Sequence, residues 1–321
     1  MRSTVSVLAL SLVSLFSGSS LALAAEPPPA WAYPMNPPDF KARVEDGVAR
    51  HVPDSTAEYS VTQLRDRFIA PVWHPEDHPQ LPPIVAQGRK PQVYACGMCH
   101  REDGPGGPES ASLAGLPEAY IVQQLADFKS GDRQSAVPKR NVDLMIALSR
   151  AITEAEVKEA AAYFAALKPQ RTIKVVETDS VPKTQVEGMF LVPLSNGEKE
   201  PIGQRIIEVP VDLERFENRD PRAQFIAYVP PGSVAQGARL VSTGGGGKTQ
   251  PCAACHGPDL RGLGAVPSIA GRSPSYIVRQ MYDIQSGARK GPSTQLMQAP
   301  MAHLTGADRV VIAAYLASLA P

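Results

Sequence analysis

One short motif occurs twice in this sequence, and it limits what the chain can fold into more than any other feature. Cys-x-x-Cys-His stands at 96–100 and again at 252–256. Two thiols at this spacing can add across the two vinyl groups of one haem, and the adjacent histidine reaches the iron from one face. All the cysteines of the chain lie in these motifs, so none remains for a structural disulfide. The motifs therefore predict two covalently attached haem c groups (Fe), carried by Cys96, Cys99 and His100 and by Cys252, Cys255 and His256.

The motifs belong to a longer internal repeat. At an offset of 156 residues (256 − 100), Ser112-Leu-Ala-Gly115 matches Ser268-Ile-Ala-Gly271. A four-residue deletion then shifts the offset to 152, at which Thr153 matches Thr305. A repeat of this length predicts two copies of one unit, each of about ninety residues. We place the first copy at 82–169 and the second copy at 231–321.

Each copy shows the same plan of helices. An amphipathic helix is expected at 117–129 and at 274–285, with proline in its first turn. A final helix is expected after Thr153 and after Thr305, because each threonine is followed three positions later by an acidic residue that can complete a capping box. The predicted fold class is mainly all-α, with two tandem domains that each surround a large flat cofactor.

The remaining segments differ from the repeat. Residues 1–25 resemble a secretory signal, with a basic start, an apolar centre and small residues before the cleavage point; an uncleaved membrane anchor is the alternative. A proline-rich N-terminal extension follows at 26–81. A linker at 170–230 contains three runs that are typical of strands, 189–194, 206–211 and 224–228. Both segments are interpreted as straps over the domains or as docking elements for a partner.

The second axial ligand of each iron decides between electron transfer and catalysis, because an open position can bind oxygen or peroxide. Met145 lies eight residues before Thr153, and Met297 lies eight residues before Thr305. This shared register nominates both methionines as iron ligands, in an irregular stretch ahead of the last helix. Met301 competes with Met297, because it stands one helical turn further on.

Several other residues are candidates for the surroundings of the haems. The carbonyl of Pro267 could accept a hydrogen bond from the ligand imidazole and fix its tautomer, and Ala111 stands at the equivalent place in the first copy. Haem propionates could be bound by Tyr120, Arg133, Tyr276 and Arg289, for which ordinary packing is the alternative. His303 could also serve as an iron ligand, but its register partner is Ala151, which favours a satisfied surface histidine. The other histidines, His51, His74 and His78, are expected to be solvated.

The sequence resembles the class I cytochromes c, in particular their tandem two-haem members of the c-four type. The resemblance rests on the two Cys-x-x-Cys-His motifs, the Leu-Ala-Gly or Ile-Ala-Gly loop, the Tyr…Gln helix, the Gly-x-Arg pair and the capped final helix. It covers 82–169 and 231–321, and it implies His/Met ligation of both haems and pseudo-twofold packing of the copies. The chain departs from the pattern at Arg101, where glycine is usual, and in its long linker.

These features favour a dihaem electron carrier in the periplasm. Its partner would be a periplasmic redox protein, namely a dehydrogenase, a quinol-oxidising complex or a terminal oxidase. Lys+Arg and Asp+Glu both number 32, so no charge excess points to nucleic acid. The alternative is a dihaem enzyme, such as a peroxidase, with one open haem site. A zinc or thiol-redox protein would leave both adjacent histidines unexplained.

Overall fold

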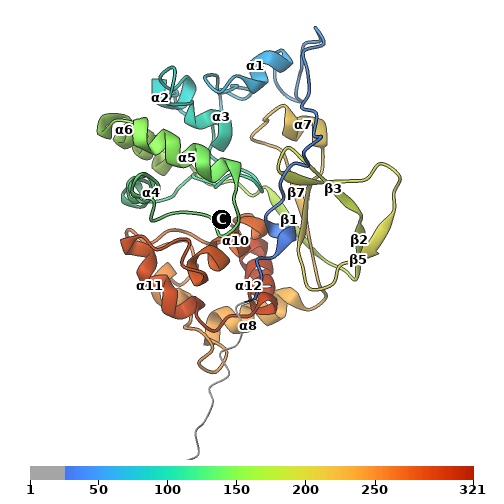
Figure 1. Ribbon diagram of the computed structural model, residues 1–321, viewed down its shortest axis with the longest axis vertical. Coiled ribbons are helices and arrows are strands. Elements are labelled where there is room, and N and C mark those ends of the chain that lie inside the picture. The colour runs from blue at the N-terminus through green and yellow to red at the C-terminus, as the bar shows by residue number, and fades with distance from the viewer. Residues whose placement is uncertain (1–25) are drawn as a thin grey trace, which may run out of the picture.

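Two helical halves lie one above the other, and a β-containing layer runs along one side of both (Figure 1). The computed structural model describes residues 26–321, so the predicted signal at 1–25 lies outside the described residues. Within the described range, no helix is both long enough and apolar enough to cross a membrane. The element order shows a largely helical fold with small sheets, as the sequence predicts.

The first copy forms the upper half of Figure 1, and its helices close around a core of their own. Phe164, Val85 and Ala161 lie at the centre of this core, and each is almost fully buried. The helices of the first copy are α2 (Pro83–Ala86), α3 (Cys96–His100), α4 (Glu118–Ser130), α5 (Arg140–Ala151) and α6 (Glu154–Ala166).

The second copy repeats these elements in the lower half of the figure. The predicted helices at 117–129 and 274–285 are confirmed as α4 and α10. Both capping boxes are confirmed as well, with Thr153 and Thr305 accepting hydrogen bonds from the backbone N–H three residues on. The helices of the second copy are α8 (Ser233–Thr243), α9 (Ala253–His256), α10 (Pro274–Gln285), α11 (Pro292–Met301) and α12 (Gly306–Ser318).

The linker contains more strands than the sequence predicts. The three expected runs correspond to β4, β6 and β7. A three-stranded sheet has the order β1-β7-β6, with β1 parallel and β6 antiparallel to β7, and two antiparallel pairs, β2-β5 and β3-β4, lie beside it. The linker elements are β1 (Ile173–Glu177), β2 (Ser180–Pro182), β3 (Thr184–Glu187), β4 (Phe190–Pro193), β5 (Lys199–Pro201), β6 (Ile207–Pro210), α7 (Leu213–Glu217) and β7 (Phe225–Val229).

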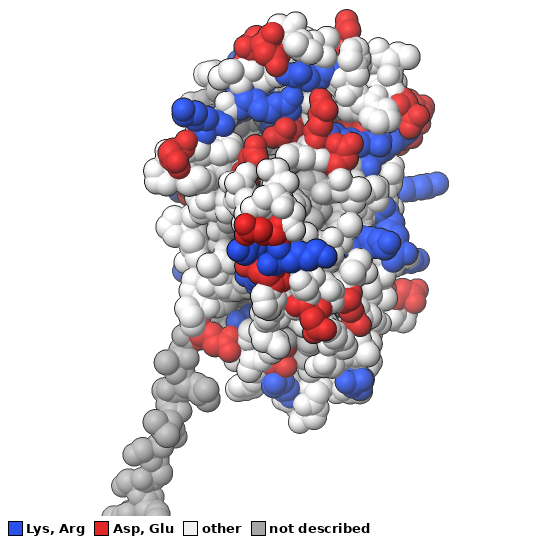
Figure 2. All heavy atoms as spheres, turned by 90° about the vertical axis from the view of Figure 1, so that its right-hand side faces the viewer, with Lys and Arg blue, Asp and Glu red and all other residues white. Residues whose placement is uncertain are grey.

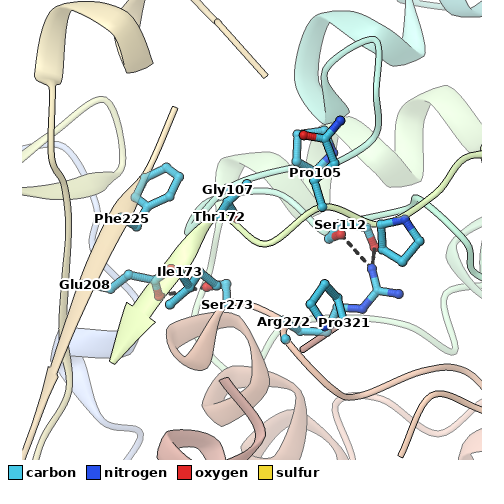
Figure 3. Close-up of a pocket in the computed structure, with 13 residues that line it drawn as sticks. Pro105, Gly107, Ser112, Thr172, Ile173, Glu208, Phe225, Arg272, Ser273 and Pro321 are labelled. Carbon is cyan, nitrogen blue, oxygen red and sulfur yellow. Dashed lines mark hydrogen bonds between the residues drawn. The ribbon is translucent and has the colours of Figure 1, made fainter. Parts of the chain in front are cut away.

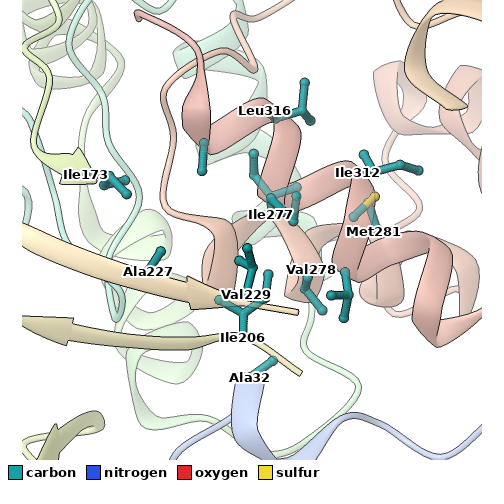
Figure 4. Close-up of a cluster of buried hydrophobic side chains, with 14 of the residues drawn as sticks. Ala32, Ile173, Ile206, Ala227, Val229, Ile277, Val278, Met281, Ile312 and Leu316 are labelled. Carbon is teal, nitrogen blue, oxygen red and sulfur yellow. The ribbon is translucent and has the colours of Figure 1, made fainter. Parts of the chain in front are cut away.

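The linker sheet is part of the core of the second copy. Ala227 and Val229 of β7, Ile206 and Val278 of α10 belong to one buried cluster (Figure 4). The face shown in Figure 2 carries acidic and basic side chains interspersed with each other. Within the linker, Lys183 and Glu198 form an ion pair at 2.7 Å. All four residues of β6 are buried, because Ile207 and Val209 pack with Val181 and Ile202 in a second, smaller apolar cluster.

The N-terminal extension is also packed into the fold. Its ordered elements are η1 (Ala30–Ala32) and α1 (Val61–Arg65). Tyr33 donates a hydrogen bond to Asp283 at 2.7 Å, and Trp73 donates one to the Asn218 carbonyl at 2.8 Å. The prediction that His74 is solvated is wrong. Its ring is fully buried, with Nε2 3.1 Å from Asp220 Oδ1, because the segment around Trp73 is enclosed between the first copy and the linker.

Lys139, at the start of α5, gives this packing a testable pH dependence. Its side chain is buried, and its Nζ donates only to the Pro34 carbonyl, at 3.3 Å. Burial, helped by the nearby Arg279 guanidinium, lowers the pKa of Lys139 to about 7. Above that pH the unfolded chain still holds a proton that the folded chain has released. The free energy of unfolding therefore rises with pH between about 7 and 10.

We expect Lys139→Leu to raise the free energy of unfolding at pH 7 by at least about 1 kcal/mol, because no charge is then desolvated. The gain should be largest below pH 7 and should vanish near pH 10. Urea unfolding at several pH values measures both effects, and Lys129→Leu, at an exposed position of α4, is the control. If the Lys139→Leu protein keeps the wild-type slope with pH, this explanation is contradicted.

Candidate haem-binding sites

The two motif histidines have the same hydrogen-bond geometry. His100 ends α3, with its Nδ1 2.8 Å from the Ala111 carbonyl oxygen, and His256 ends α9, with its Nδ1 2.8 Å from the Pro267 carbonyl oxygen. A backbone carbonyl is available from either residue type, so alanine serves as well as proline. An Nδ1–H that donates to a carbonyl leaves Nε2 as the atom with a free lone pair.

The free nitrogen of His256 has the properties of a metal ligand. Its Nε2 is buried and has no hydrogen-bond partner among the described residues. Burial lowers the pKa of both His256 and His100, so both rings are neutral near pH 7. An unpartnered buried acceptor costs about 1–3 kcal/mol. A bound iron would use this atom, so the site fits the haem group that the motif implies.

The two cysteines of each motif are placed to bond to the same group. A spacing of three residues brings two side chains to the same side of a helical turn. Burial, and then the neighbouring Cys99 thiol, raise the pKa of Cys96 to about 12, and burial raises that of Cys252 to about 11. Thiols with raised pKa values are poor nucleophiles for disulfide exchange. In the described residues the four cysteines form no disulfide.

Both candidate methionines lie in helices, which corrects the expectation of an irregular stretch. Met145 is in α5, Met297 is in α11, and both side chains are half-buried. Met301 is only 5 % exposed and belongs to the core of the second copy. Its register partner is Ser149, whereas the partner of Met297 is Met145. The repeat therefore continues to favour Met297 over Met301.

The structure brings the four candidate propionate residues together at the contact between the copies. Arg133 donates to Tyr276 Oη at 2.8 Å, and Arg289 donates to Tyr120 Oη at 2.9 Å. The backbones of the two arginines also face each other in an antiparallel bridge. Each contact has its mirror at the offset of the repeat, so the two copies pack with pseudo-twofold symmetry, as the family resemblance implies.

Two glutamines complete this cluster, and sequence reasoning did not assign them to the site. Gln124 Oε1 accepts from Arg133 and from Arg289, at 2.9 and 2.7 Å, and Gln280 Oε1 accepts from the same two arginines, at 3.2 and 2.9 Å. The spacing of tyrosine and glutamine that recurs in both copies was the sequence signal that could have indicated them. Because a glutamine oxygen is neutral, these hydrogen bonds do not neutralise the guanidinium charges; buried Asp127 lies near Arg289, and buried Asp283 lies near Arg133.

A third buried arginine lies nearby, in a small pocket where both copies and the linker meet (Figure 3). Arg272 donates to Ser112 Oγ at 2.6 Å and to the Ala114 carbonyl at 3.2 Å. The Nε atoms of Arg272 and Arg289 are buried and have no partner among the described residues. Desolvated cations with unused donors favour a bound anion close by.

Arg219 of the linker is a further residue that the repeat could not reveal, because the linker has no counterpart. Its Nη1 donates to the Met98 carbonyl of α3 at 2.9 Å, and its Nε donates to the Leu64 carbonyl at 2.7 Å. Burial lowers the pKa of this guanidinium to about 10, and it stays charged at pH 7. Arg219 therefore fastens the first attachment helix to the N-terminal extension.

Several known proteins are similar to this chain over much of its length. The family model described as cytochrome c matches residues 234–320. The thiosulfate dehydrogenase electron acceptor of Thiomonas intermedia is 27 % identical over 233 residues, which cover 71 % of this chain and 80 % of that protein. Cytochrome c4 of Pseudomonas aeruginosa is 24 % identical over 233 residues, covering 71 % of this chain and 85 % of that protein.

A shorter relative matches more closely, and one solved structure supports the fold. Cytochrome c-554(548) of Halomonas halodenitrificans is 41 % identical over 69 residues, covering 21 % of this chain and 82 % of that protein. The solved thiosulfate dehydrogenase (TsdBA) of Marichromatium purpuratum aligns with a TM-score of 0.50 and 25 % identity over 74 % of this chain. The alignment spans only 39 % of that longer chain. The chain thus belongs to the cytochrome c family, with distant homology over most of its length to cytochrome c4 and to the electron acceptor of thiosulfate dehydrogenase.

Proposed function

We propose that this protein is a dihaem c-type cytochrome that carries electrons in the periplasm. One haem is attached to the first copy through Cys96 and Cys99, and the other to the second copy through Cys252 and Cys255. The iron ligands are His100 with Met145 and His256 with Met297. When bound, each haem supplies a centre that accepts and releases one electron.

The observation that carries this proposal is the equivalence of the two sites. Both histidines present Nε2 because Nδ1 is 2.8 Å from a carbonyl oxygen, and both methionines occupy the same register on equivalent helices. The chain supplies a neutral imidazole and a thioether at each site. A thioether ligand favours the ferrous state and leaves no open position for a substrate. Two such sites suit electron transfer better than the alternative peroxidase-like enzyme.

The buried arginines support an assignment for the haem propionates. Arg133, Arg289 and Arg272 are desolvated at the contact between the copies, and their hydrogen bonds go to neutral groups. Propionates from both haems would supply the anionic partners, with Tyr120 and Tyr276 as further donors. Both haems would then direct their acidic edges toward the same interface, where electrons pass between them without a diffusive step.

The electron donor proposed here is a dehydrogenase of the thiosulfate-oxidising type. The support is that a relative covering most of this chain is described as the electron acceptor of such an enzyme. The electrons would continue to a terminal acceptor, such as an oxidase. A quinol-oxidising complex is the other donor class that the sequence left open.

The haem content and the visible spectrum test the proposal. We expect two haems per chain in the pyridine haemochrome assay, and one in the double variant Cys252→Ser/Cys255→Ser. The oxidised protein should show the methionine–iron charge-transfer band for both haems, and thiosulfate dehydrogenase with thiosulfate should reduce both. A high-spin haem that binds carbon monoxide in the native reduced protein would favour the enzyme instead, and fewer than two haems would refute the proposal.

A further inference from the structure

Arg101 has a backbone conformation that suits glycine. It follows His100 directly and ends α3 with φ 67° and ψ 159°, and the equivalent residue of the second copy, Gly257, has φ 81° and ψ 162°. This combination is almost confined to glycine, so any other residue that adopts it raises the free energy of the folded chain. The backbone alone therefore does not explain why an arginine stands at this position.

The linker buries the side chain of Arg101. The residue is only 3 % exposed, and its Cζ lies 5.2 Å from the centroid of the Phe216 ring in α7. Its Nη1 is buried and has no hydrogen-bond partner among the described residues. Its Nη2 is 3.7 Å from Glu109 Oε1, which is too far for a hydrogen bond. Arg101 is therefore a desolvated cation beside the first attachment motif, and one carboxylate offsets it in part.

A second guanidinium lies against the same motif. Arg219, which follows α7, donates to the carbonyl of Met98 at 2.9 Å and to the carbonyl of Leu64 at 2.7 Å. Met98 stands between the two attachment cysteines, and both acceptors are neutral. Burial, and then the charge of Arg101, lower the pKa of Arg219, so the two cations lie close to each other. The linker thus places two guanidinium groups beside α3.

These cations outweigh the acidic groups around the first attachment site. Burial raises the pKa of Cys99, and among its charged neighbours Arg219 and Arg101, which lower that pKa, act more strongly than Glu109, which raises it. Burial also raises the pKa of Glu102 to about 8, so this carboxyl is mostly neutral at pH 7. The other acidic residues nearby are exposed, paired or close to the N-terminal extension; they are Glu159, Glu156, which binds Arg89 at 2.7 Å, and Asp103, which is close to His78.

The second attachment site has neither cation. Gly257 stands where Arg101 stands in the first copy, and Arg219 has no counterpart because the linker is absent from the repeat. Burial raises the pKa of Cys252, and the one charge that acts on it is that of the neighbouring Cys255 thiol. The charged residues nearest to this motif in the sequence are exposed or paired; they are Asp259, Arg261 and Lys248, which binds Asp308 at 2.7 Å.

We infer that Arg101 and Arg219 raise the reduction potential of the first haem above that of the second, so that the first copy holds the electron of the half-reduced protein. Ferric haem carries one more positive charge than ferrous haem, and a desolvated cation nearby disfavours the ferric form. In the internal transfer the second iron loses one electron and the first iron gains it, and no bond or proton changes place. The inference rests on the proposed function, and it gives the linker a role in the direction of electron transfer.

Spectroelectrochemical titration of the holoprotein tests this inference. In the wild type we expect the electron to favour the first copy by about tenfold or more, which equals a separation of at least about 59 mV between the two midpoints. Arg101→Met and Arg219→Gln each remove one charge and keep most of the side-chain volume. Each should shift the reduction equilibrium of the first haem by about tenfold toward the ferric form and leave the second within about twofold. The midpoint that disappears in Cys96→Ser/Cys99→Ser belongs to the first haem.

Two kinds of control variant separate charge from packing. Arg101→Lys and Arg219→Lys keep the charge but change the shape and the hydrogen bonds of the side chain, so both should keep the first equilibrium within about twofold. Arg150→Gln removes an exposed charge from α5 of the same copy, and it should have as little effect because water screens that charge. If either charge-removing variant keeps the wild-type midpoint, or if the lysine variants lower it equally, the inference is wrong.

The haem assay separates this inference from the proposed function. Midpoints are compared only among variants that hold two haems and show the wild-type methionine–iron band. Fewer than two haems in the wild type would refute the proposed function, whereas two haems with the higher potential in the second copy would overturn this inference alone. If Arg101→Met does not fold, Arg101→Gly replaces it, because glycine is the residue of the second copy at this position, and the same lowered midpoint is expected. An unchanged first midpoint in Arg101→Gly would likewise overturn the inference.

Discussion

Replacing Met297 with alanine is expected to lower the midpoint potential of one haem by on the order of 0.1 V, out of the roughly 0.8 V over which axial ligands set haem potentials. The potential falls because the lost thioether no longer stabilises the ferrous state. The other haem should keep its potential, and Met145→Ala should produce the converse result. Spectroelectrochemical titration resolves the two midpoints, and the methionine–iron band should lose half its intensity in either variant.

Met301→Ala is the matched control for this experiment. Met301 lies four residues after Met297 on the same helix but is buried in the core of the second copy. Its truncation should leave both potentials near their wild-type values and cost about 2–5 kcal/mol of unfolding free energy, as is usual for a core methionine. A lowered potential in Met301→Ala, with both haems unchanged in Met297→Ala, would assign the ligand to Met301.

Trp73→Ala is expected to destabilise the folded protein by about 3–5 kcal/mol. The indole is 1 % exposed, and it packs against Val52 and Leu64 in a small core of the N-terminal extension. Its ring meets Tyr59 edge-on at a centroid distance of 4.8 Å, and its Nε1 donates to the Asn218 carbonyl at 2.8 Å. Truncation removes the packing and leaves that linker carbonyl without its partner.

Denaturant unfolding of the holoprotein measures this loss. Trp73→Phe keeps an aromatic ring without the indole N–H, so it should cost clearly less than the alanine variant. If the extension were only loosely attached, Trp73→Ala would change the free energy of unfolding by less than about 1 kcal/mol, as surface substitutions do.

The helical framework could be predicted from the sequence because its signals are local. The capping boxes at Thr153 and Thr305 need only four consecutive residues, and the limits of α10 follow from Pro274 and the apolar spacing after it. The family also followed from local signals, since each motif places its three reactive side chains within five residues. Local signals of this kind do not depend on how distant parts of the chain pack.

Features that depend on distant segments could not be predicted. His74 is buried because Asp220 lies beside it, 146 residues later in the chain. Met145 lies in a helix because α5 packs against α4. No capping residue or periodic pattern in the sequence indicated this helix. Strand β1 was missed because its partner in the sheet is β7, about fifty residues further on. Arg219 had no register partner, because the linker is absent from the repeat.

The hydrogen bonds of Arg133 and Arg289 cross between the two copies, so the buried arginine of each copy depends on side chains of the other. Each guanidinium is bound by a glutamine of its own copy and by a tyrosine and a glutamine of the other. A substitution at Tyr276 therefore removes an acceptor from an arginine encoded 143 residues earlier. A change at these positions in either copy alters the hydrogen bonds of a buried arginine in the other copy, so the two copies constrain each other's substitutions there.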